Sequence, residues 1–274
     1  MPNRAARHAL LVNALPSARV LVIGDAALER EVSGIPAGIA PEAPVPLLTH
    51  AAAEAHPGGA AAILWALEAL RVECALGTVV GTDPAGRELL SVLGGRGIDT
   101  DGIVREPRRA TPVRERFLAG SQTLLRVDHG GGACPAAASE RLIAWVARAI
   151  VHFDAIVIAE RGLGVLAGDT LSRLVSLAVM SERPLVVEAV SADPAACAPA
   201  RVFKPSPALL RRASGLPIET EADLVAAARA VMARHAFEAI LAPHGDGGMT
   251  LVPREGEEIR IAAERGLLFD AAGT

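Results

Sequence analysis

Three acidic residues that follow apolar runs are the side chains best placed to do chemistry in this sequence. Each run is typical of a buried strand: Asp25 comes after residues 20–23, Glu160 after residues 155–159, and Glu188 after residues 184–187. Because parallel strands end at the same edge of a sheet, we expect the three carboxylates to line one edge. Carboxylates accept hydrogen bonds from hydroxyl groups, and this suits a sugar.

A glycine pair and two short alternating segments complete the predicted site. Pro57-Gly58-Gly59 precedes an alanine-rich helix expected over residues 60–70, whose free N–H groups can hold a hydroxyl or an anion. Residues 30–33 and 45–48 alternate between polar and apolar side chains, as flap strands do. The pattern therefore predicts a sugar site under a lid.

A predicted hairpin over residues 111–128 turns at Gly120-Ser121 and carries a group of arginines. Its guanidinium groups belong to Arg114, Arg116 and Arg126. They can bind a sugar phosphate, or they can pair with Glu115 and Asp128 on a solvated strand face. The sequence leaves both interpretations open.

Helices and strands alternate along the rest of the chain with short connections. Asp83-Pro84, for example, predicts the cap and first turn of a helix after an apolar strand. This alternation predicts an α/β fold with a doubly wound, mostly parallel central sheet flanked by helices, and a small β lid. We expect a lead-in helix over residues 1–18 and one domain over residues 19–274. Its lid strands are expected at about residues 29–50 and 103–127.

Composition excludes several classes of protein. The 274 residues are 51% hydrophobic, enough for one large core, and the net charge of −4 argues against a nucleic-acid partner. The three cysteines are far apart, which indicates neither a disulfide framework nor a zinc site. No run reaches membrane-spanning length. We expect a cytoplasmic protein with no membrane partner.

The order of these motifs resembles that of the ribokinase-like (PfkB) carbohydrate kinases. The match rests on Gly24-Asp25, Pro41-Glu42-Ala43-Pro44-Val45-Pro46, the Pro57-Gly58-Gly59 helix start, and Gln122, Leu124, Arg126 and Asp128. Within that family the chain looks most like the kinase domain of bifunctional heptose 7-phosphate kinase/adenylyltransferases. The resemblance implies phosphoryl transfer from ATP, with Mg²⁺, to a heptose phosphate or related sugar, and a homodimer formed through the lid.

The resemblance also assigns roles to single residues. The sugar would be bound by Asp25, Glu29, Gly58, Gly59, Arg126 and Glu160, and the nucleotide by Lys204, Ser206, His244, Gly245 and Gly248. Asp270 and Gly273 match the start of the family's anion-hole motif. The sequence stops two residues before the catalytic aspartate of that motif, so we expect no catalytic base and no following helices in this chain.

Four positions depart from the family pattern. Glu29 replaces a sugar-binding aspartate and Ala62 a sugar-binding asparagine, while Ser206 and Leu209 replace the Asn-x-x-Glu that organises Mg²⁺. A leucine cannot hold a hydrated hard cation. We therefore expect an impaired sugar kinase and no protein metal ligands. The alternatives are a non-catalytic pseudokinase that binds ligand or partners, and a structural domain of a larger complex.

Overall fold

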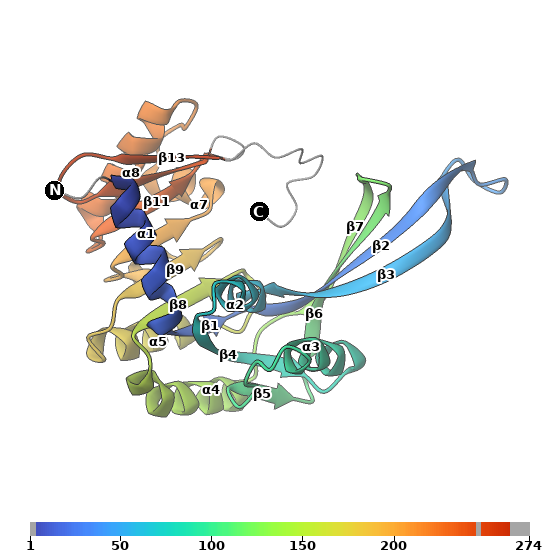
Figure 1. Ribbon diagram of the computed structural model, residues 1–274, viewed down its shortest axis with the longest axis horizontal. Coiled ribbons are helices and arrows are strands. Elements are labelled where there is room, and N and C mark those ends of the chain that lie inside the picture. Colours follow the sequence, from blue (N-terminus) through green and yellow to red (C-terminus); the bar gives the residue numbers. More distant parts are fainter. Residues whose placement is uncertain (1–3, 245–247, 264–274) are drawn as a thin grey trace.

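A nine-stranded sheet forms the centre of the protein (Figure 1). The computed structural model describes residues 4–244 and 248–263. In chain order the strands of this sheet are β1 (Arg19–Gly24), β4 (Glu73–Gly81), β5 (Ile103–Glu106), β8 (Ala155–Glu160), β9 (Leu185–Ala189), β10 (Val202–Pro205), β11 (Ala239–Pro243), β12 (Gly248–Pro253) and β13 (Ile259–Ala262). The strand order is β13-β12-β11-β10-β9-β8-β1-β4-β5. The β11–β12 and β12–β13 pairs are antiparallel and the rest are parallel, which confirms the predicted fold class.

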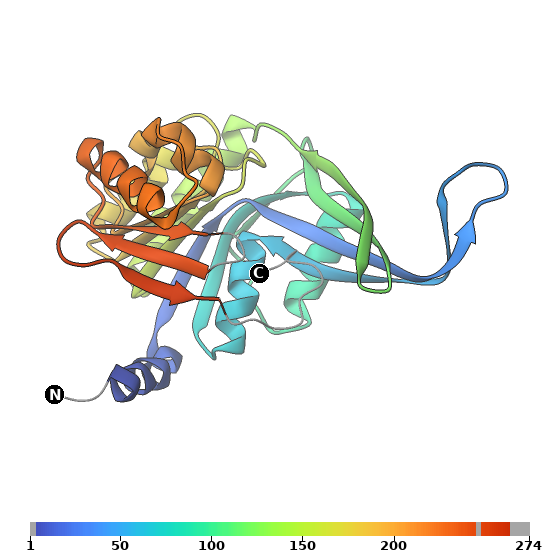
Figure 2. The ribbon, with the colours of Figure 1, turned by 90° about the horizontal axis from the view of Figure 1, so that it is seen from above.

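Helices cover the sheet from both sides, and one further helix, the N-terminal one, stands apart from it (Figure 2). They are α1 (Arg4–Ala14), α2 (Ala60–Ala69), α3 (Pro84–Gly94), α4 (Ala136–Ala149), α5 (Thr170–Met180), α6 (Pro194–Cys197), α7 (Pro207–Ser214) and α8 (Glu221–Arg234), with 3₁₀ turns at Leu15–Ser17 and Ile150–His152. Figure 2 shows α7 and α8 on one side of the sheet, α2 on the other, and α1 projecting away from both groups. In the described part of the chain, no helix combines the length and apolar character needed to cross a bilayer.

The core has one hydrophobic cluster on each face of the sheet. Successive side chains of β1 alternate between them, because strand residues point to opposite faces: Leu21 and Ile23 join the first cluster, Val22 the second. The first cluster includes buried residues of α4, α5, α7 and α8, and the second those of α2 and α3. Because β1 is packed on both faces, its carboxyl end has a fixed position. The residues that follow it, beginning with Asp25, are therefore held in place.

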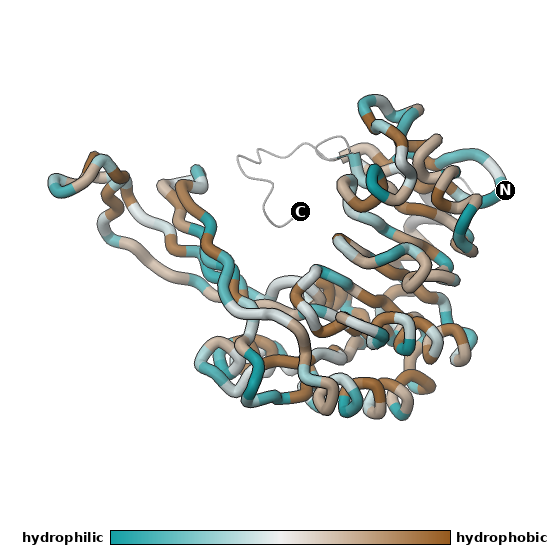
Figure 3. Tube along the Cα trace, turned by 180° about the vertical axis from the view of Figure 1, so that it is seen from behind, coloured by the Kyte–Doolittle hydropathy of each residue, from teal (hydrophilic) through white to brown (hydrophobic). Residues whose placement is uncertain are grey.

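The lid is a separate four-stranded sheet in the order β3-β2-β6-β7. Its strands are β2 (Ala26–Ile39), β3 (Pro46–Gly59), β6 (Ala110–Ala119) and β7 (Gln122–Gly131). The lid projects far from the central sheet, and its free ends mix hydrophilic and hydrophobic segments (Figures 1 and 3). The expected lid boundary at residue 103 is wrong, because β5 pairs with β4 in the large sheet and the second lid hairpin begins at Ala110.

Candidate active site

Asp25 follows β1 directly and holds the loop that leaves β8. Its carboxylate accepts hydrogen bonds from the backbone N–H groups of Arg161 (2.8 Å), Leu163 (3.1 Å) and Val165 (2.8 Å), and the residue is 1% exposed. Burial raises the pKa of the Asp25 carboxyl, and the three amide donors oppose that rise. Asp25 therefore fixes the shape of this loop.

Glu160 likewise accepts hydrogen bonds from the backbone of a later loop, at the end of the neighbouring strand β8. At the end of β8, its Oε2 accepts the backbone N–H groups of Val190 (2.9 Å), Ser191 (2.8 Å) and Ala192 (3.0 Å). The Ser191 hydroxyl donates to Oε1 at 2.7 Å. Burial acts to raise the pKa of Glu160, but the donors of Ser191 and its neighbours outweigh it, so the pKa is lowered.

The loops that these two acids hold enclose a cavity of about 350 Å³. Asp25 and Glu160 both line it, together with Gly162, Gly164 and Ser191. The structure thus brings together two of the predicted sugar-binding acids. Their carboxylates are engaged by protein donors, so here they shape the cavity.

The glycine pair places the start of α2 against the end of β1. Gly59 has φ 60°, and the N–H of Ala60 donates to the Asp25 carbonyl oxygen at 2.8 Å. A Cβ on Gly59 would lie 2.2 Å from that oxygen, and a Cβ on Gly58 would lie 2.6 Å from Cγ of Glu29. Only glycine fits at either position without a shift of the backbone or of Glu29.

Glu29 lies in a second cavity, of about 400 Å³, between the lid and α2. Its walls also include Glu31, His56, Pro57, Ala62, Trp65, Ala66, Ala69 and Arg116. Glu29 pairs with Arg114 (3.3 Å) and Arg116 (3.1 Å). The methyl group of Ala62 offers no hydrogen bond to this cavity. Glu29 and Asp25 are thus assigned to two different cavities.

The remaining lid arginines are also paired in this structure. Arg126 donates to both oxygens of Asp128 (3.0 and 2.6 Å), and Arg114 to one of them (3.3 Å). The hydrogen bond from Arg126 lowers the pKa of Asp128. Of the two interpretations left open by the sequence, this structure shows pairing with Asp128, and among the described residues none of the three arginines pairs with Glu115. Glu115 instead contacts Arg30 and His129.

Glu188 ends the row of acids and lies between two cations. Its Oε2 accepts a hydrogen bond from Nη2 of Arg161 at 2.8 Å, and its Oε1 pairs with Nζ of Lys204. Lys204 and Glu188 are register partners on the parallel strands β10 and β9. The predicted nucleotide-binding lysine therefore reaches the same sheet edge as the acids.

The two positions that organise Mg²⁺ in the family do not fit a metal here. The Ser206 hydroxyl caps α7 by accepting the N–H of Leu209 (3.2 Å), and Leu209 is 1% exposed in the core. Within residues 4–244 and 248–263, no group of three or more His, Cys, Asp or Glu could hold a metal ion. These side chains supply no ligands for a divalent cation.

Of the predicted nucleotide loop, only its two ends are described. Nε2 of His244 lies 2.6 Å from Oγ1 of Thr250, and the N–H of His244 donates to the carbonyl oxygen of Gly248 (2.8 Å). Gly245, Asp270 and Gly273 lie outside the described residues. The two described ends are thus hydrogen-bonded to each other.

Two contacts at the base of the lid were not anticipated from the sequence. Asp83 caps α3 as predicted, accepting the Gly86 N–H at 2.9 Å, and it also accepts the N–H and the hydroxyl of Thr111 in β6. Buried Arg109 donates to the carbonyl oxygens of Gly132 (2.6 Å) and Leu163 (2.8 Å). The Asp83 contacts join the lid to α3, and Arg109 joins it to the cavity loop. No local pattern marks Arg109, whereas a capping aspartate was recognisable.

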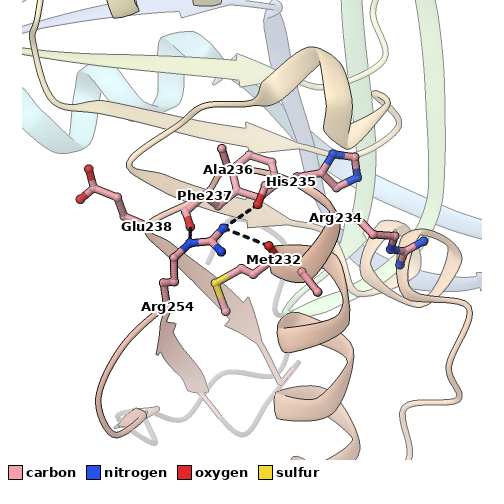
Figure 4. A pocket seen from close by; sticks show the side chains of 8 residues that line it. Met232, Arg234, His235, Ala236, Phe237, Glu238 and Arg254 are labelled. Carbon is pink, nitrogen blue, oxygen red and sulfur yellow. Dashed lines mark hydrogen bonds between the residues drawn. The ribbon is translucent and has the colours of Figure 1, made fainter.

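A larger, more open hollow of about 500 Å³ lies where α8 ends and β11 begins (Figure 4). Its central group is Arg254, which donates to the carbonyl oxygens of Phe237 (2.8 Å), Met232 (2.9 Å) and His235 (2.6 Å). The guanidinium group thus satisfies carbonyls left free at the end of α8. We interpret this hollow as structural, because the predicted site residues lie at the other ends of the strands.

Solved structures with the same architecture define the fold as ribokinase-like. The Arabidopsis thaliana ribokinase complexed with ribose and ATP aligns over 89% of this chain and 78% of its own, with a TM-score of 0.65 at 16% identity. Phosphofructokinase-2 from Escherichia coli, in complex with fructose-6-phosphate, aligns over 89% and 79%, with a TM-score of 0.69 at 17% identity.

The chain belongs to the pfkB family of carbohydrate kinases, whose family model matches residues 17–274. Among curated proteins, it is 35% identical to the bifunctional protein HldE of Rhodospirillum rubrum over 264 residues, 96% of this chain and 53% of that protein. The corresponding protein of Paramagnetospirillum magneticum is 34% identical over 263 residues, 96% and 54%. The chain therefore spans about half the length of the curated relatives it matches.

Proposed function

We propose that this chain is the sugar-phosphate-binding kinase unit of its protein and transfers a phosphoryl group from ATP to a heptose phosphate or a related sugar. The observation that carries the proposal is the cavity between the lid and α2, where Arg116 and Glu29 meet. Guanidinium groups recognise phosphate with two parallel hydrogen bonds, and carboxylates recognise hydroxyl groups. The HldE relatives support this assignment by their similarity over nearly the whole chain.

The lid arginines would change partners when a sugar phosphate enters. Arg114 and Arg116 now share Glu29, which is an acceptor that a phosphate can replace. Glu29 would then be free to accept a sugar hydroxyl. Because hydrogen bonds to charged groups contribute about 1.5–3 kcal/mol each, one arginine should change affinity by about 10–150-fold.

Calorimetry of the full-length gene product tests this proposal. Heptose 7-phosphate should bind at least tenfold more tightly than the unphosphorylated heptose, and Arg116→Met should abolish that preference. An Arg201→Met variant, on the exposed pair with Glu238, serves as the control. Equal binding of the two sugars, or an unchanged preference in Arg116→Met, would contradict the proposal.

A second candidate, a non-catalytic sugar-binding homologue, is favoured by Ala62 and by the buried Leu209. Loss of the polar contact at position 62 would cost about 1–3 kcal/mol in sugar binding. Sugar-dependent ADP formation from ATP distinguishes the two. Turnover supports the kinase, while tight sugar-phosphate binding without turnover supports the non-catalytic homologue.

We also propose that the protein forms a homodimer through its lids. Large apolar side chains are exposed on the lid strands: Ile35 (61%), Ile39 (64%), Leu124 (37%) and Leu125 (55%). Such a surface is typical of an interface between subunits. Light scattering should give twice the monomer mass, and Ile35→Glu with Leu125→Glu should give the monomer mass.

A further inference from the structure

Two cations, Arg161 and Lys204, share one carboxylate, that of Glu188, at the edge of the sheet. Arg161 directly follows β8, while Glu188 and Lys204 are the penultimate residues of the neighbouring strands β9 and β10. Their side chains are 34%, 12% and 28% exposed, so the carboxylate is covered and the two cations are partly open to solvent. A cluster of this kind attracts anions.

Most donors of the two cations are unused. A guanidinium has five N–H donors and an ammonium three, yet the only acceptor that the described residues give to the side chains of Arg161 and Lys204 is Glu188. Nε of Arg161 is buried, and none of the described residues accepts a hydrogen bond from it. Donors left unpaired in this way favour a ligand rich in oxygen acceptors.

At the two described positions where the family organises Mg²⁺, this edge presents no metal ligand. Ser206 is engaged in capping α7, and Leu209 is buried beneath that helix. The negative charge of a phosphate chain bound here would have to be offset by other groups. Arg161 and Lys204 are the cations adjacent to that position.

We propose that Arg161 and Lys204 bind a phosphate group directly and provide the positive charge that a divalent cation would otherwise bring. The ligand class is a polyphosphate, such as that of a nucleoside triphosphate. The assignment to the nucleotide rests on the proposed kinase function, whereas phosphate binding itself does not. Glu188 holds the two cations together and competes with the ligand for them.

Calorimetric titration of the full-length protein with ATP and with tripolyphosphate, each in EDTA and in MgCl₂, tests the proposal. Both ligands should bind in EDTA, with affinities within threefold of those in MgCl₂. Lys204→Met and Arg161→Met should each weaken binding at least tenfold, and Glu188→Gln should strengthen it severalfold. Heptose 7-phosphate should be unaffected by all three changes, which separates this site from the lid cavity.

Arg201→Met is the matched control, because Arg201 precedes β10, pairs with the exposed Glu238, and lies at the opposite end of the strand from Lys204. It removes the same charge and should leave polyphosphate affinity unchanged. Circular dichroism checks that each variant is folded. If Arg161→Met does not fold, Lys204→Met and Glu188→Gln decide the question with opposite expected signs.

Failure of polyphosphate to bind in EDTA, or binding that both methionine variants leave unchanged, would overturn the inference. Weaker binding by Glu188→Gln would also overturn it, because that result indicates a purely structural cluster. Sugar-dependent ATP turnover is measured separately. Turnover together with ATP binding that strictly requires Mg²⁺ would support the kinase function and contradict this inference. ATP binding in EDTA without turnover would support this inference and contradict the kinase function.

Discussion

Replacement of Glu160 tests how strongly the acids stabilise the cavity loops. Glu160→Ala removes the acceptor of three backbone N–H groups and one hydroxyl, at a residue that is 6% exposed. A part-buried hydrogen bond to a carboxylate contributes about 1 kcal/mol or more, so loss of these bonds should lower the free energy of unfolding by about 3 kcal/mol. For a chain of this size, that corresponds to a Tm lowered by roughly 6–12 °C.

Glu160→Gln should be milder, because its carbonyl oxygen can still accept the three amides, and what is lost is the charge and the acceptor of the Ser191 hydroxyl. Its effect should also depend on pH. The folded pKa of Glu160 lies below its ordinary value of 4.5, so the carboxylate contributes stability above that value and loses it as the pH falls through the folded pKa. The difference between wild type and Glu160→Gln should therefore be full at pH 7 and shrink below pH 4.5.

Urea unfolding followed by circular dichroism, at pH 7 and at points down to pH 3.5, measures both effects. Glu73→Ala is the control, because Glu73 is an exposed acid at the opposite end of a strand of the same sheet. The reasoning would be refuted by a Glu160→Ala variant within 1 kcal/mol of wild type at pH 7. A Glu160→Gln effect that grew on acidification would refute it equally.

Three further substitutions give expected losses of stability, each measured by urea unfolding. Gly59→Ala should cost at least about 1–3 kcal/mol, because φ is 60° and the new Cβ would meet the Asp25 carbonyl oxygen. Asp83→Ala should cost about 2 kcal/mol through loss of the α3 cap and of the Thr111 contacts, and limited proteolysis should cut the lid faster. Leu209→Glu should cost about 3 kcal/mol or more and should create no Mg²⁺ binding in calorimetry, because position 209 is 1% exposed in the core.

Each of these substitutions has an outcome that contradicts its reasoning. A Gly59→Ala protein as stable as Gly97→Ala, where a Cβ meets nothing within 4 Å at a similar φ, would show that the close approach to Asp25 has no cost. For Asp83→Ala, an unchanged rate of lid proteolysis would show that the contacts between Asp83 and Thr111 do not hold the lid. A stable Leu209→Glu variant that binds Mg²⁺ would show that position 209 can still supply a metal ligand, against the reasoning from its burial.

The central sheet was predictable because its strands are short apolar runs whose ends are marked by polar residues. The run over 155–159, for example, became β8 at Ala155–Glu160. What the sequence could not show is that the acids at these ends are already engaged. Their partners are backbone N–H groups of later loops, and every residue except proline carries such a group, so no side-chain pattern reveals them.

The lid was predicted less completely, for two physical reasons. Residues 51–55 are alanine-rich with one glutamate, and alanine has little strand propensity, so the length of β3 comes from its pairing with β2. In addition, neighbouring strand residues point to opposite faces. Glu115 therefore cannot pair with Arg114 or Arg116 on either side of it, and it meets Arg30 on the other face of the lid.

The acids at the sheet edge have an evolutionary consequence. Because Asp25 and Glu160 bind only main-chain amides of residues 161–165 and 190–192, apart from the Ser191 hydroxyl, these loops can change most of their side chains and keep their conformation. Proline is one exception, since it has no N–H to donate. Gly162 and Gly164 are another, because both have positive φ and a Cβ on Gly164 would lie 2.0 Å from the Gly132 carbonyl oxygen. The protein can thus acquire new ligand preferences at this edge by exchanging loop side chains around a constant pair of carboxylates.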